Sequence, residues 1–396
     1  MKHITLICLF MFVVLIPAFC QSSKDYRIFG KITTVENTEI TGYIAWGSQK
    51  LYWTDIFEAS KPQNPYRQYF NSGDRVKFYN DNMETYTPPT HIFTCRFGNI
   101  KQIRPTGYNK IELQIRDGNS IELSRGNYYD IGKALSVYTQ AKESITVKWE
   151  KISTIEFMTA NEDIDDSYNT PIAGIVKTNQ GIYKGLVTWD KDEKTLKSPL
   201  DGRTNKGNVS VPFSSVRKII KRNNSCEVVL QGGQTQEMWG SNDVDNQNRG
   251  IIVNMPNIGI VSIPWRNFEI FESVSPDEIN LLGYADFENQ QRLSGEVITR
   301  KGEKIAGIIA YDLDESMNFE ILEGMNDNMS YEIPFRYIKS IEPKNYKYSL
   351  ITLTNGSALS LGDSVDVDYR NSGVIVFRNN ENPVYIPWKE ITLISF

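Results

Sequence analysis

Two stretches of the chain carry the same spaced set of oxygen-bearing side chains. Each reads D-x-D-x-x-N-x-G, an aspartate pair followed by an asparagine and a glycine. Calcium prefers carboxylate and amide oxygens, and a glycine lets a loop bend around the ion. The spacing differs from that of an EF-hand, and no glutamate follows at the required distance. A calcium site is still one hypothesis, and its candidate ligands are Asp243, Asp245, Asn248, Asp366, Asp368 and Asn371.

A second acidic group also occurs twice, as Asp190, Asp192 and Glu193 and as Asp312, Asp314 and Glu315. At the corresponding place nearer the N-terminus the chain reads Gly47-Ser48-Gln49, so a metal site of this kind would be confined to the two later places. A structural interpretation competes for both acidic groups. Asp and Asn side chains often accept hydrogen bonds from their own backbone in the turn before a strand.

Paired carboxylates could also serve as the acid and base of a glycosidase-like hydrolase. Acids that recur at equivalent positions fit structural turns better than a single active site, so we predict no catalytic residues. Beyond the N-terminal leader the chain contains a single histidine, His91, and two cysteines, Cys95 and Cys226. Zinc sites, Ser-His-Asp triads and Cys-His pairs would all depend on that one imidazole. We expect both cysteines to be buried thiols in strands.

Aromatic side chains offer another route to function. They are concentrated in and beside an insertion at residues 55–94 that is rich in proline, asparagine and tyrosine. Aromatic loops on a rigid β-scaffold can hold a sugar ring or a peptide. The alternative is that these rings cover the core of their own domain. The candidate ligand-binding residues are Trp53, Tyr66, Tyr69, Tyr79 and Tyr86.

An internal repeat must position these groups. The stretch 228–271 returns nearly intact as 351–394, and a more divergent copy ends near Trp149, which matches Trp265 and Trp388. A second recurring stretch precedes each copy, and the two stretches share their glycine and aromatic spacing. Each copy is therefore a pair of half-units of about 50 residues, and a unit that small needs its partner for a core.

One half-unit shows the physical pattern. Alternating residues run into a turn at Asn179-Gln180-Gly181 and return towards Trp189, which indicates a β-hairpin. A later strand at 209–213 contains Pro212, which cannot donate to a sheet, so this proline is expected at a sheet edge or at a strand end. Val216 and Ile219 then follow at a spacing of three, which predicts a short helical turn. Trp149, Trp265 and Trp388 are expected in the core.

The hairpin at Val297-Ile298-Thr299, Gly302, Gly307-Ile308-Ile309 and Tyr311-Asp312 resembles the opening motif of the Sm-like and SH3-like small-barrel families. The paired pattern also resembles repeats of exported bacterial proteins of unassigned function. The fold that these resemblances imply is all-β, with three tandem copies, each a pair of SH3/Sm-like small barrels or sandwich halves. A short linker helix is expected to begin with Ser275 as N-cap and Pro276 at its first position.

The predicted organisation is a signal peptide at 1–20, a first segment at 21–158 that includes the insertion, an acidic linker at 159–171, a second segment at 172–274, the linker helix at 275–291 and a third segment at 292–396. The leader combines Lys2, an apolar run at 4–16 and small residues at Ala18 and Cys20, which fits cleavage before Gln21. Lipidation of Cys20 is less favoured, because Phe19 stands where a lipobox has a small residue.

The formal net charge of −5 and the absence of a Lys/Arg cluster argue against a nucleic-acid partner. No later stretch is apolar enough to span a bilayer. We predict an exported, non-catalytic binding or scaffold protein that is periplasmic, outer-membrane-associated or secreted, with an envelope protein or glycan as partner. The alternatives are the glycosidase-like hydrolase and a calcium-dependent carbohydrate-binding module. Apart from calcium, no cofactor is expected.

Overall fold

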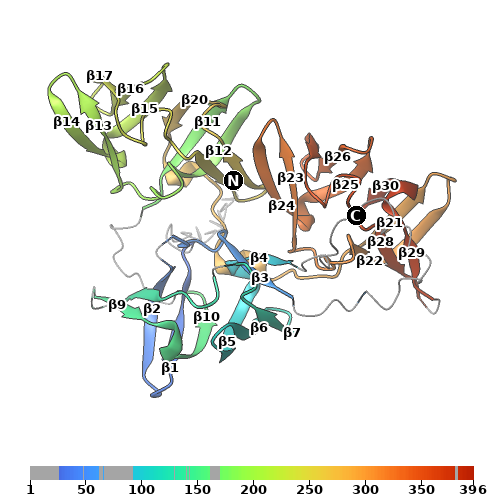
Figure 1. The fold of residues 1–396 in the computed structure, drawn as a ribbon. Helices are drawn as coiled ribbons and strands as arrows, with labels where there is room; N and C mark the ends of the chain where they lie inside the picture. The colour runs from blue at the N-terminus through green and yellow to red at the C-terminus, as the bar shows by residue number, and fades with distance from the viewer. Residues whose placement is uncertain are drawn as a thin grey trace, which may run out of the picture.

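The computed structural model describes residues 26–47, 49–61, 66, 92–128, 130–139, 141, 143–160, 170–379 and 382–396. These residues form thirty β-strands joined by turns and short 3-10 helices, and none of them lies in an α-helix. The predicted all-β class is confirmed. Figure 1 shows three lobes, in blue to teal, green to yellow, and orange to red, which correspond to the three segments. Within the described ranges, no helix has the length and apolar character needed to cross a membrane.

The first segment forms one antiparallel sheet with the strand order β4-β3-β7-β6-β5-β10-β1-β2-β8-β9. Its strands are β1 (Phe29–Thr34), β2 (Glu39–Trp46), β3 (Ile56–Ser60), β4 (Ile92–Arg96), β5 (Ile100–Gly107), β6 (Lys110–Ile115), β7 (Ser120–Ser124), β8 (Leu135–Tyr138), β9 (Ser144–Val147) and β10 (Ile152–Phe157). β3 and β4 lie at the two ends of the stretch that the sequence assigned to an insertion, so 56–60 and 92–94 belong to the sheet.

The second segment pairs its strands in the order β17-β16-β15-β20-β11-β12-β18-β19. A separate hairpin, β13–β14, touches this sheet through a bridge between Arg203 and Trp239. The strands are β11 (Ala173–Thr178), β12 (Ile182–Thr188), β13 (Pro199–Thr204), β14 (Gly207–Pro212), β15 (Val216–Lys221), β16 (Cys226–Leu230), β17 (Thr235–Met238), β18 (Ile251–Met255), β19 (Gly259–Ile263) and β20 (Phe268–Ser273).

The third segment pairs its strands in the order β24-β23-β27-β26-β25-β30-β21-β22-β28-β29. The strands are β21 (Ser294–Thr299), β22 (Lys304–Tyr311), β23 (Ile321–Asn326), β24 (Met329–Pro334), β25 (Ile338–Pro343), β26 (Tyr348–Leu353), β27 (Ala358–Gly362), β28 (Val374–Phe377), β29 (Val384–Ile386) and β30 (Ile391–Ser395). Strand for strand, this order matches that of the first segment, and the sheets are open.

A glycine in the second strand of each segment explains part of the recurring spacing. Gly42, Gly185 and Gly307 each lie where another strand crosses closely. A Cβ atom on Gly185 would lie 2.3 Å from the carbonyl oxygen of Asn254 in β18, and the equivalents in the other segments would lie 2.3 and 2.4 Å from a carbonyl oxygen. Only glycine allows this approach, so the pattern reflects backbone packing.

The expected helical turn lies slightly earlier than predicted. Five half-units contain a one-turn 3-10 helix that begins with a buried aromatic residue, and these are η2 (Phe97–Asn99), η3 (Trp149–Lys151), η4 (Phe213–Ser215), η7 (Phe335–Tyr337) and η8 (Trp388–Glu390). Val216 already belongs to β15. A register shift between Val216 and Lys218 lets Val216 and Ile219 both reach the core, which produces the spacing of three inside a strand.

The linker between the second and third segments forms two short 3-10 helices, η5 (Pro276–Glu278) and η6 (Tyr284–Phe287), where a single helix was expected. The predicted cap is correct, because Ser275 Oγ accepts a hydrogen bond from the Asp277 amide at 3.3 Å. The chain leaves η5 to pack η6 against the first segment. Tyr284 of η6 stacks on Trp53 of the first segment with ring centroids 4.5 Å apart. The linker therefore packs against that segment and does not continue as one helix.

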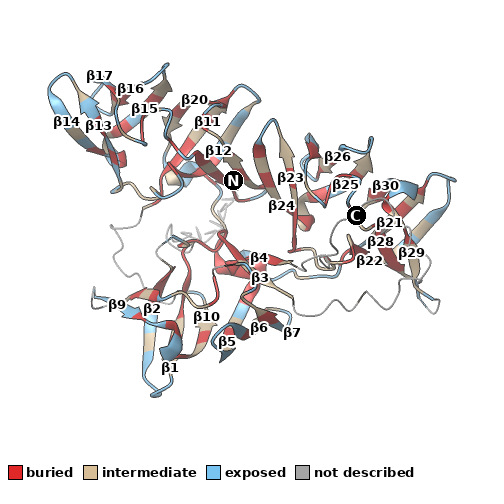
Figure 2. Cartoon of the chain, viewed as in Figure 1, coloured by how far each residue is buried: buried red, intermediate tan, exposed pale blue. Residues whose placement is uncertain are grey.

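The three segments also contact one another directly. β19 of the second pairs with β24 of the third, so those two share one sheet and one core. Arg96 of the first segment donates to the carbonyl oxygen of Pro256 in the second at 2.6 Å. Lys61 of the first forms an ion pair with Glu320 of the third at 2.6 Å. Figure 2 shows buried residues, in red, in the strands of all three lobes.

Candidate functional site

In the second segment, the first aspartate of the D-x-D-x-x-N-x-G loop, Asp243, forms hydrogen bonds with two other parts of the segment. Asp243 Oδ2 accepts a hydrogen bond from the backbone amide of Asp201 in β13 at 2.6 Å. The carbonyl oxygen of Asp243 accepts the indole N–H of Trp189 at 2.8 Å. This one residue therefore joins the hairpin β13–β14 to the end of β12, where Trp189 is fully buried.

The third segment repeats these contacts, and so does the first. Asp366 Oδ2 accepts the amide of Glu323 at 2.6 Å, and its carbonyl oxygen accepts the hydroxyl of Tyr311. In the first segment the equivalent residue is Asp130, which accepts the amide of Glu58 at 2.9 Å and the indole N–H of Trp46 at 3.0 Å. Sequence reasoning missed Asp130.

A short signal could have identified Asp130. Each of the three aspartates is followed by a β-branched residue that is almost fully buried, namely Ile131, Val244 or Val367. In the first segment this two-residue signature is all that remains of the longer loop pattern, because a glycine follows where the other segments have their second aspartate.

The remaining candidate calcium ligands accept hydrogen bonds within their own loops. Asn248 Oδ1 accepts the amide of Gly250 at 2.9 Å, and Asn371 accepts the amide of Gly373 at 2.8 Å. Asp245 accepts the amide of Gln247 at 2.8 Å. These contacts are those of polar turns.

Asp368, the last of these candidates, is held by Arg370. Its Oδ1 accepts the Arg370 backbone amide at 2.9 Å, and its Oδ2 accepts the guanidinium at 2.6 Å. An arginine on the same carboxylate supplies the positive charge that a metal ion would otherwise supply. The structure therefore gives Asp368 a structural ion pair.

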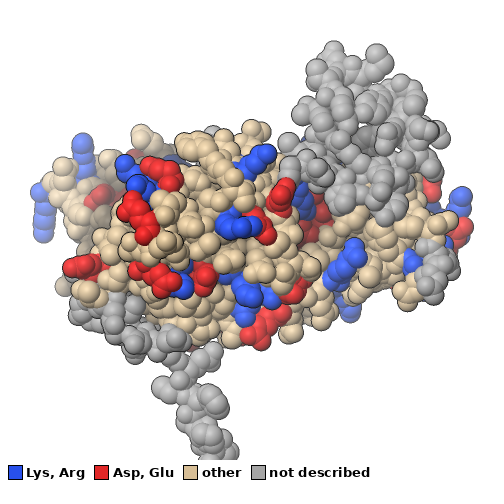
Figure 3. All heavy atoms as spheres, turned by 90° about the horizontal axis from the view of Figure 1, so that it is seen from below, with Lys and Arg blue, Asp and Glu red and all other residues tan. Residues whose placement is uncertain are grey.

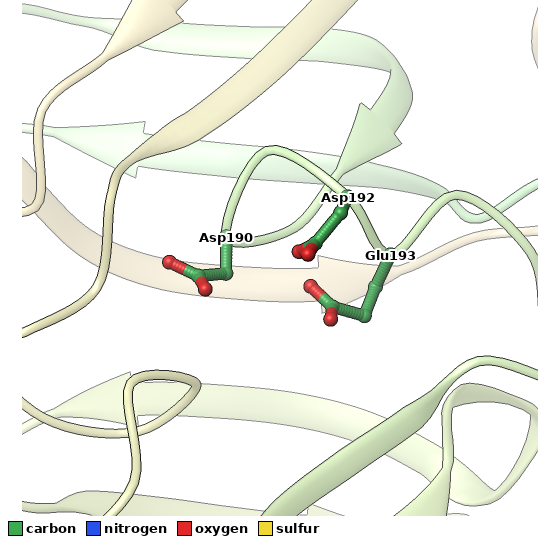
Figure 4. Close-up of side chains that lie close together, drawn as sticks. All are labelled: Asp190, Asp192 and Glu193. Carbon is green, nitrogen blue, oxygen red and sulfur yellow. The ribbon is translucent and has the colours of Figure 1, made fainter. Parts of the chain in front are cut away.

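Asp190, Asp192 and Glu193 do come together, and Figure 4 shows the carboxylates of Asp192 and Glu193 next to each other, with that of Asp190 turned away from them. One ligand atom from each lies within 4.8 Å of the others. The guanidinium of Arg249 already pairs with two of these carboxylates. Arg249 donates to Asp190 Oδ2 at 2.8 Å and also forms an ion pair with Asp192.

The turn that carries these acids has a backbone reason for its composition. Asp190 has a φ of 45° and Asp312 a φ of 44°, and Gly47 occupies the same place in the first segment with a φ of 57°. Asp and Gly are among the residues that tolerate this left-handed conformation. The alternation of Asp and Gly at this place therefore follows from the turn.

Glu193 is the member of this group without a basic partner. Among the described residues, its Oε2 has no hydrogen-bond partner. Burial raises the pKa of Glu193 to about 8, with further contributions from Asp192 and Asp243. Burial also raises the pKa of Asp243 to about 6, although the amide of Asp201 lowers it. The surroundings of Glu193 therefore favour its protonated form relative to that of an exposed glutamate.

The candidate aromatic residues that the structure describes lie in different environments. Trp53 is fully buried and stacks on Tyr284, so it belongs to the core. Tyr66 lies beside Phe377 of the third segment, with ring centroids 6.1 Å apart. The other three, Tyr69, Tyr79 and Tyr86, lie outside the described residues.

Three tyrosines of the third segment are exposed, and sequence reasoning missed them. Tyr346, Tyr348 and Tyr369 are 64%, 37% and 55% exposed, and Val365, which precedes Tyr369 in the sequence, is 46% exposed. The rings of Tyr346 and Tyr369 meet edge to face at 6.3 Å. The available signal was the D-x-D-x-x-N-x-G loop itself. Tyr369 in the loop and Val365 just before it are exposed in the third segment, and the second segment has Asn246 and Asn242 at these places.

Two hollows lie on the described surface. A polar hollow of about 490 Å³ in the second segment is lined by Arg222, Asn223, Ser225, Glu227, Thr235, Gln236 and Glu237. A smaller apolar crevice of about 140 Å³ lies where β19 meets β24, beside the hydrogen-bonded hydroxyls of Tyr183 and Tyr331. On the face shown in Figure 3, basic and acidic side chains are interspersed.

Cys95 and Cys226 are both buried free thiols, as expected for thiols in strands. Burial raises the pKa of Cys226 to about 12 and places that of Cys95 well above its ordinary value, so neither thiol is a ready nucleophile.

Comparison with known proteins finds no relative of this chain. No protein-family model matches it, and searches of curated proteins and of solved structures find no match.

Proposed function

We propose that this chain is an exported, non-catalytic binding and scaffold protein that contacts a glycan through the tyrosine cluster of its third segment. The tyrosine cluster consists of Tyr346, Tyr348 and Tyr369. We further propose that the three segments are copies of one unit built from paired small β half-units. The equivalent strand orders and the equivalent roles of Asp130, Asp243 and Asp366 support this relationship.

The observation that supports the proposal is that two equivalent surface positions hold asparagines in the second segment and tyrosines in the third. In the second segment Asn246 Nδ2 donates to the carbonyl oxygen of Asn223 at 3.3 Å. Tyr369 and Tyr346 occupy those positions in the third segment. In the third segment the Tyr369 backbone amide donates to the carbonyl oxygen of Tyr346 at 3.0 Å, so the contact between the two turns does not need the large rings. Exposing them is unfavourable in water, which is a reason to assign them to binding.

The chemistry of the cluster suits a sugar chain. A tyrosine ring offers an apolar face to the C–H side of a sugar, and its hydroxyl can exchange hydrogen bonds with sugar hydroxyls. Lys347 lies 5.5 Å from the centre of the Tyr346 ring. Arg370 is paired with Asp368 next to Tyr369 and adds polar groups at the edge.

The recurring carboxylates support a non-catalytic role. A glycosidase needs an acid and a base that face a substrate across a cleft. Asp130, Asp243 and Asp366 each accept a backbone amide of their own segment, and the same arrangement occurs three times. Groups repeated in this way act as structural connections.

Affinity electrophoresis through gels that contain soluble polysaccharides tests the proposal. We expect at least one polysaccharide to retard the wild type, and Tyr346→Ala or Tyr369→Ala to weaken this about tenfold or more. Tyr108→Ala is the matched control, because Tyr108 is a 73% exposed tyrosine in the first segment. Release of reducing ends from the retained polysaccharide, abolished by Asp243→Asn or Asp366→Asn, would instead show a hydrolase.

Export is tested separately. Processing before Gln21 predicts a mature N-terminus at that residue in protein recovered from outside the cytoplasm. Mass spectrometry of the N-terminal peptide would show it. A retained leader, or a lipid on Cys20, would contradict the proposed processing.

A further inference from the structure

Two edge strands of neighbouring segments are joined within the chain. β19 is the last strand in the order of the second segment, and it pairs with β24, the first strand in the order of the third. None of the six paired residues is exposed, and the pairs are Ile260 with Glu332, Val261 with Tyr331 and Ser262 with Ser330. The last strand of one segment thus joins the first strand of the next.

The first and second segments leave the equivalent edges open. β9 follows β8 as β19 follows β18, so it is the last strand of the first segment. A bridge from Arg203 to Trp239 attaches the hairpin β13–β14 at the place where Met325 and Gly362 attach β23–β24, so β14 is the equivalent of β24. Among the described residues, β9 pairs only with β8 and β14 only with β13.

The open edges are exposed where the joined edges are covered. The strand registers place residues 144–146 of β9 where the second segment has 260–262, and residues 208–210 of β14 where the third has 330–332. Of these six residues in β9 and β14, all but one are exposed. At the centre of β9, Ile145 is 36% exposed, whereas its equivalent in β19 is fully buried.

Neither open edge has the usual protection against pairing. Exposed edges are commonly blocked by charged side chains or by proline within the strand. Residues 144–146 and 208–210 include no charged side chain. Pro212 ends β14 as Pro334 ends β24, and β24 nevertheless pairs with β19.

The other two unjoined edges are more covered. Four of the five residues of β4 are buried, and no residue of β29 is exposed. Figure 1 shows β9 and β14 on the outer left of their lobes. An added strand therefore has access to these two edges, and strand addition to an open edge is a common mode of recognition.

We propose that β9 of one copy pairs antiparallel with β14 of a second copy, which joins copies of this chain by the same kind of strand pair that joins its second and third segments. The register of the joined edges places Ser144 opposite Ser210, Ile145 opposite Val209 and Thr146 opposite Asn208. Each copy offers one β9 and one β14, so the contact is heterologous and produces a ring or an open filament. The inference uses the equivalence of the segments and is independent of glycan binding.

One difference predicts that this contact is weaker than the joint within the chain. Gly259 allows β19 to approach the carbonyl oxygen of Glu332, and Glu143 occupies the equivalent place just before β9. A side chain at that place holds the end of the strand pair apart. We therefore expect association that depends on concentration, and Glu143→Gly should strengthen it.

Sedimentation velocity of the purified protein over a range of micromolar concentrations tests the proposal. We expect the mean mass to rise with concentration above that of one chain. Ile145→Lys should weaken the association about tenfold or more, because it places an unpaired ammonium in the middle of the joint. Val35→Lys is the matched control, because Val35 is a 55% exposed residue of the same segment outside β9, and it should associate as the wild type does.

Two double variants test the register with side chains that are exposed in the single chain. Ser144→Lys with Ser210→Glu places opposite charges across the joint and should keep the association, whereas Ser144→Lys with Ser210→Lys places like charges there and should weaken it several-fold. Equal melting temperatures at low concentration show that all variants are folded. Three results would overturn the proposal: the mass of one chain at every concentration of the wild type, undiminished association of Ile145→Lys, or equal association of the two double variants.

Discussion

The pairing of the second and third segments brings one glycine of β19 into close contact with the backbone of β24, and replacing it is a sharp perturbation. Gly259 begins β19 at the point where β19 meets β24, with a φ of 156°. A Cβ atom at Gly259 would lie 2.3 Å from the carbonyl oxygen of Glu332. Because the obstacle is backbone, the Gly259→Ala variant can relieve the clash only by moving the strands apart.

The size of the effect follows from the pairing. β19 and β24 are in register at Ile260 with Glu332, Val261 with Tyr331 and Ser262 with Ser330. Losing two or three interstrand hydrogen bonds at about 1 kcal/mol each, with the strain of an alanine at a positive φ, gives a destabilisation of about 3–4 kcal/mol. The hydroxyl contact between Tyr183 and Tyr331 should be lost as well.

Hydrogen exchange read by mass spectrometry is the appropriate assay. We expect faster exchange in peptides that cover β19 and β24 and little change in the first segment. Gly302→Ala is the control, because Gly302 has a φ of 80° but a Cβ atom added there would meet no other atom within 4 Å. Equal exchange and equal melting temperatures for the two variants would refute the shared sheet.

Two further predictions concern buried polar groups. Tyr311→Phe removes the hydroxyl that reaches the carbonyl oxygen of Asp366 and keeps the ring, so urea unfolding should show a loss of about 1–2 kcal/mol; no loss would mean that this contact is not structural. Burial, then Glu323 and Glu58, raises the pKa of Glu332 to about 7. A raised carboxyl pKa contributes stability that is complete below the unfolded value and is lost as the pH rises through the folded value. The wild type should therefore lose up to about 3 kcal/mol between about pH 5 and pH 8, and Glu332→Gln should lose less; identical melting curves against pH would contradict this.

Much of the local structure could be predicted because it depends on neighbours in the sequence. The hairpin turn at Gly181, the cap at Ser275 and the strand end at Pro212 each follow from the backbone preferences of a few adjacent residues. The burial of Trp149, Trp265 and Trp388 followed from their recurrence beside apolar residues, and the structure places all three in the core.

The features that could not be predicted depend on residues distant in the sequence. From the sequence, Trp53 was a candidate for ligand binding, but Tyr284 of η6 stacks on it. Lys50 reads as an ordinary surface lysine, and its contact with Asp130 spans 80 positions. β3 and β4 lie on either side of a long intervening stretch, which concealed their pairing. In each case a distant contact determines the role of the residue.

The candidate site illustrates the same limit. Sequence spacing identified the loop around Asp243 and Asp366, yet it could not show that the inward oxygens bind backbone amides. It also could not show which positions of the loop face outward, and these are the positions that distinguish the third segment from the second. Tyr369 meets Tyr346 in the third segment and Asn246 meets Asn223 at the equivalent place in the second, and the spacing within the loop does not reveal either contact.

The most direct test of the central claim is polysaccharide retention by the double variant Tyr346→Asn, Tyr369→Asn, which gives the third segment the surface of the second. We predict an unchanged melting temperature, because Asn223 and Asn246 already occupy this surface in a folded segment. We also predict loss of the retardation that the wild type shows in the same gel. Full retention by the double variant would contradict the assignment of the tyrosine cluster as the binding surface.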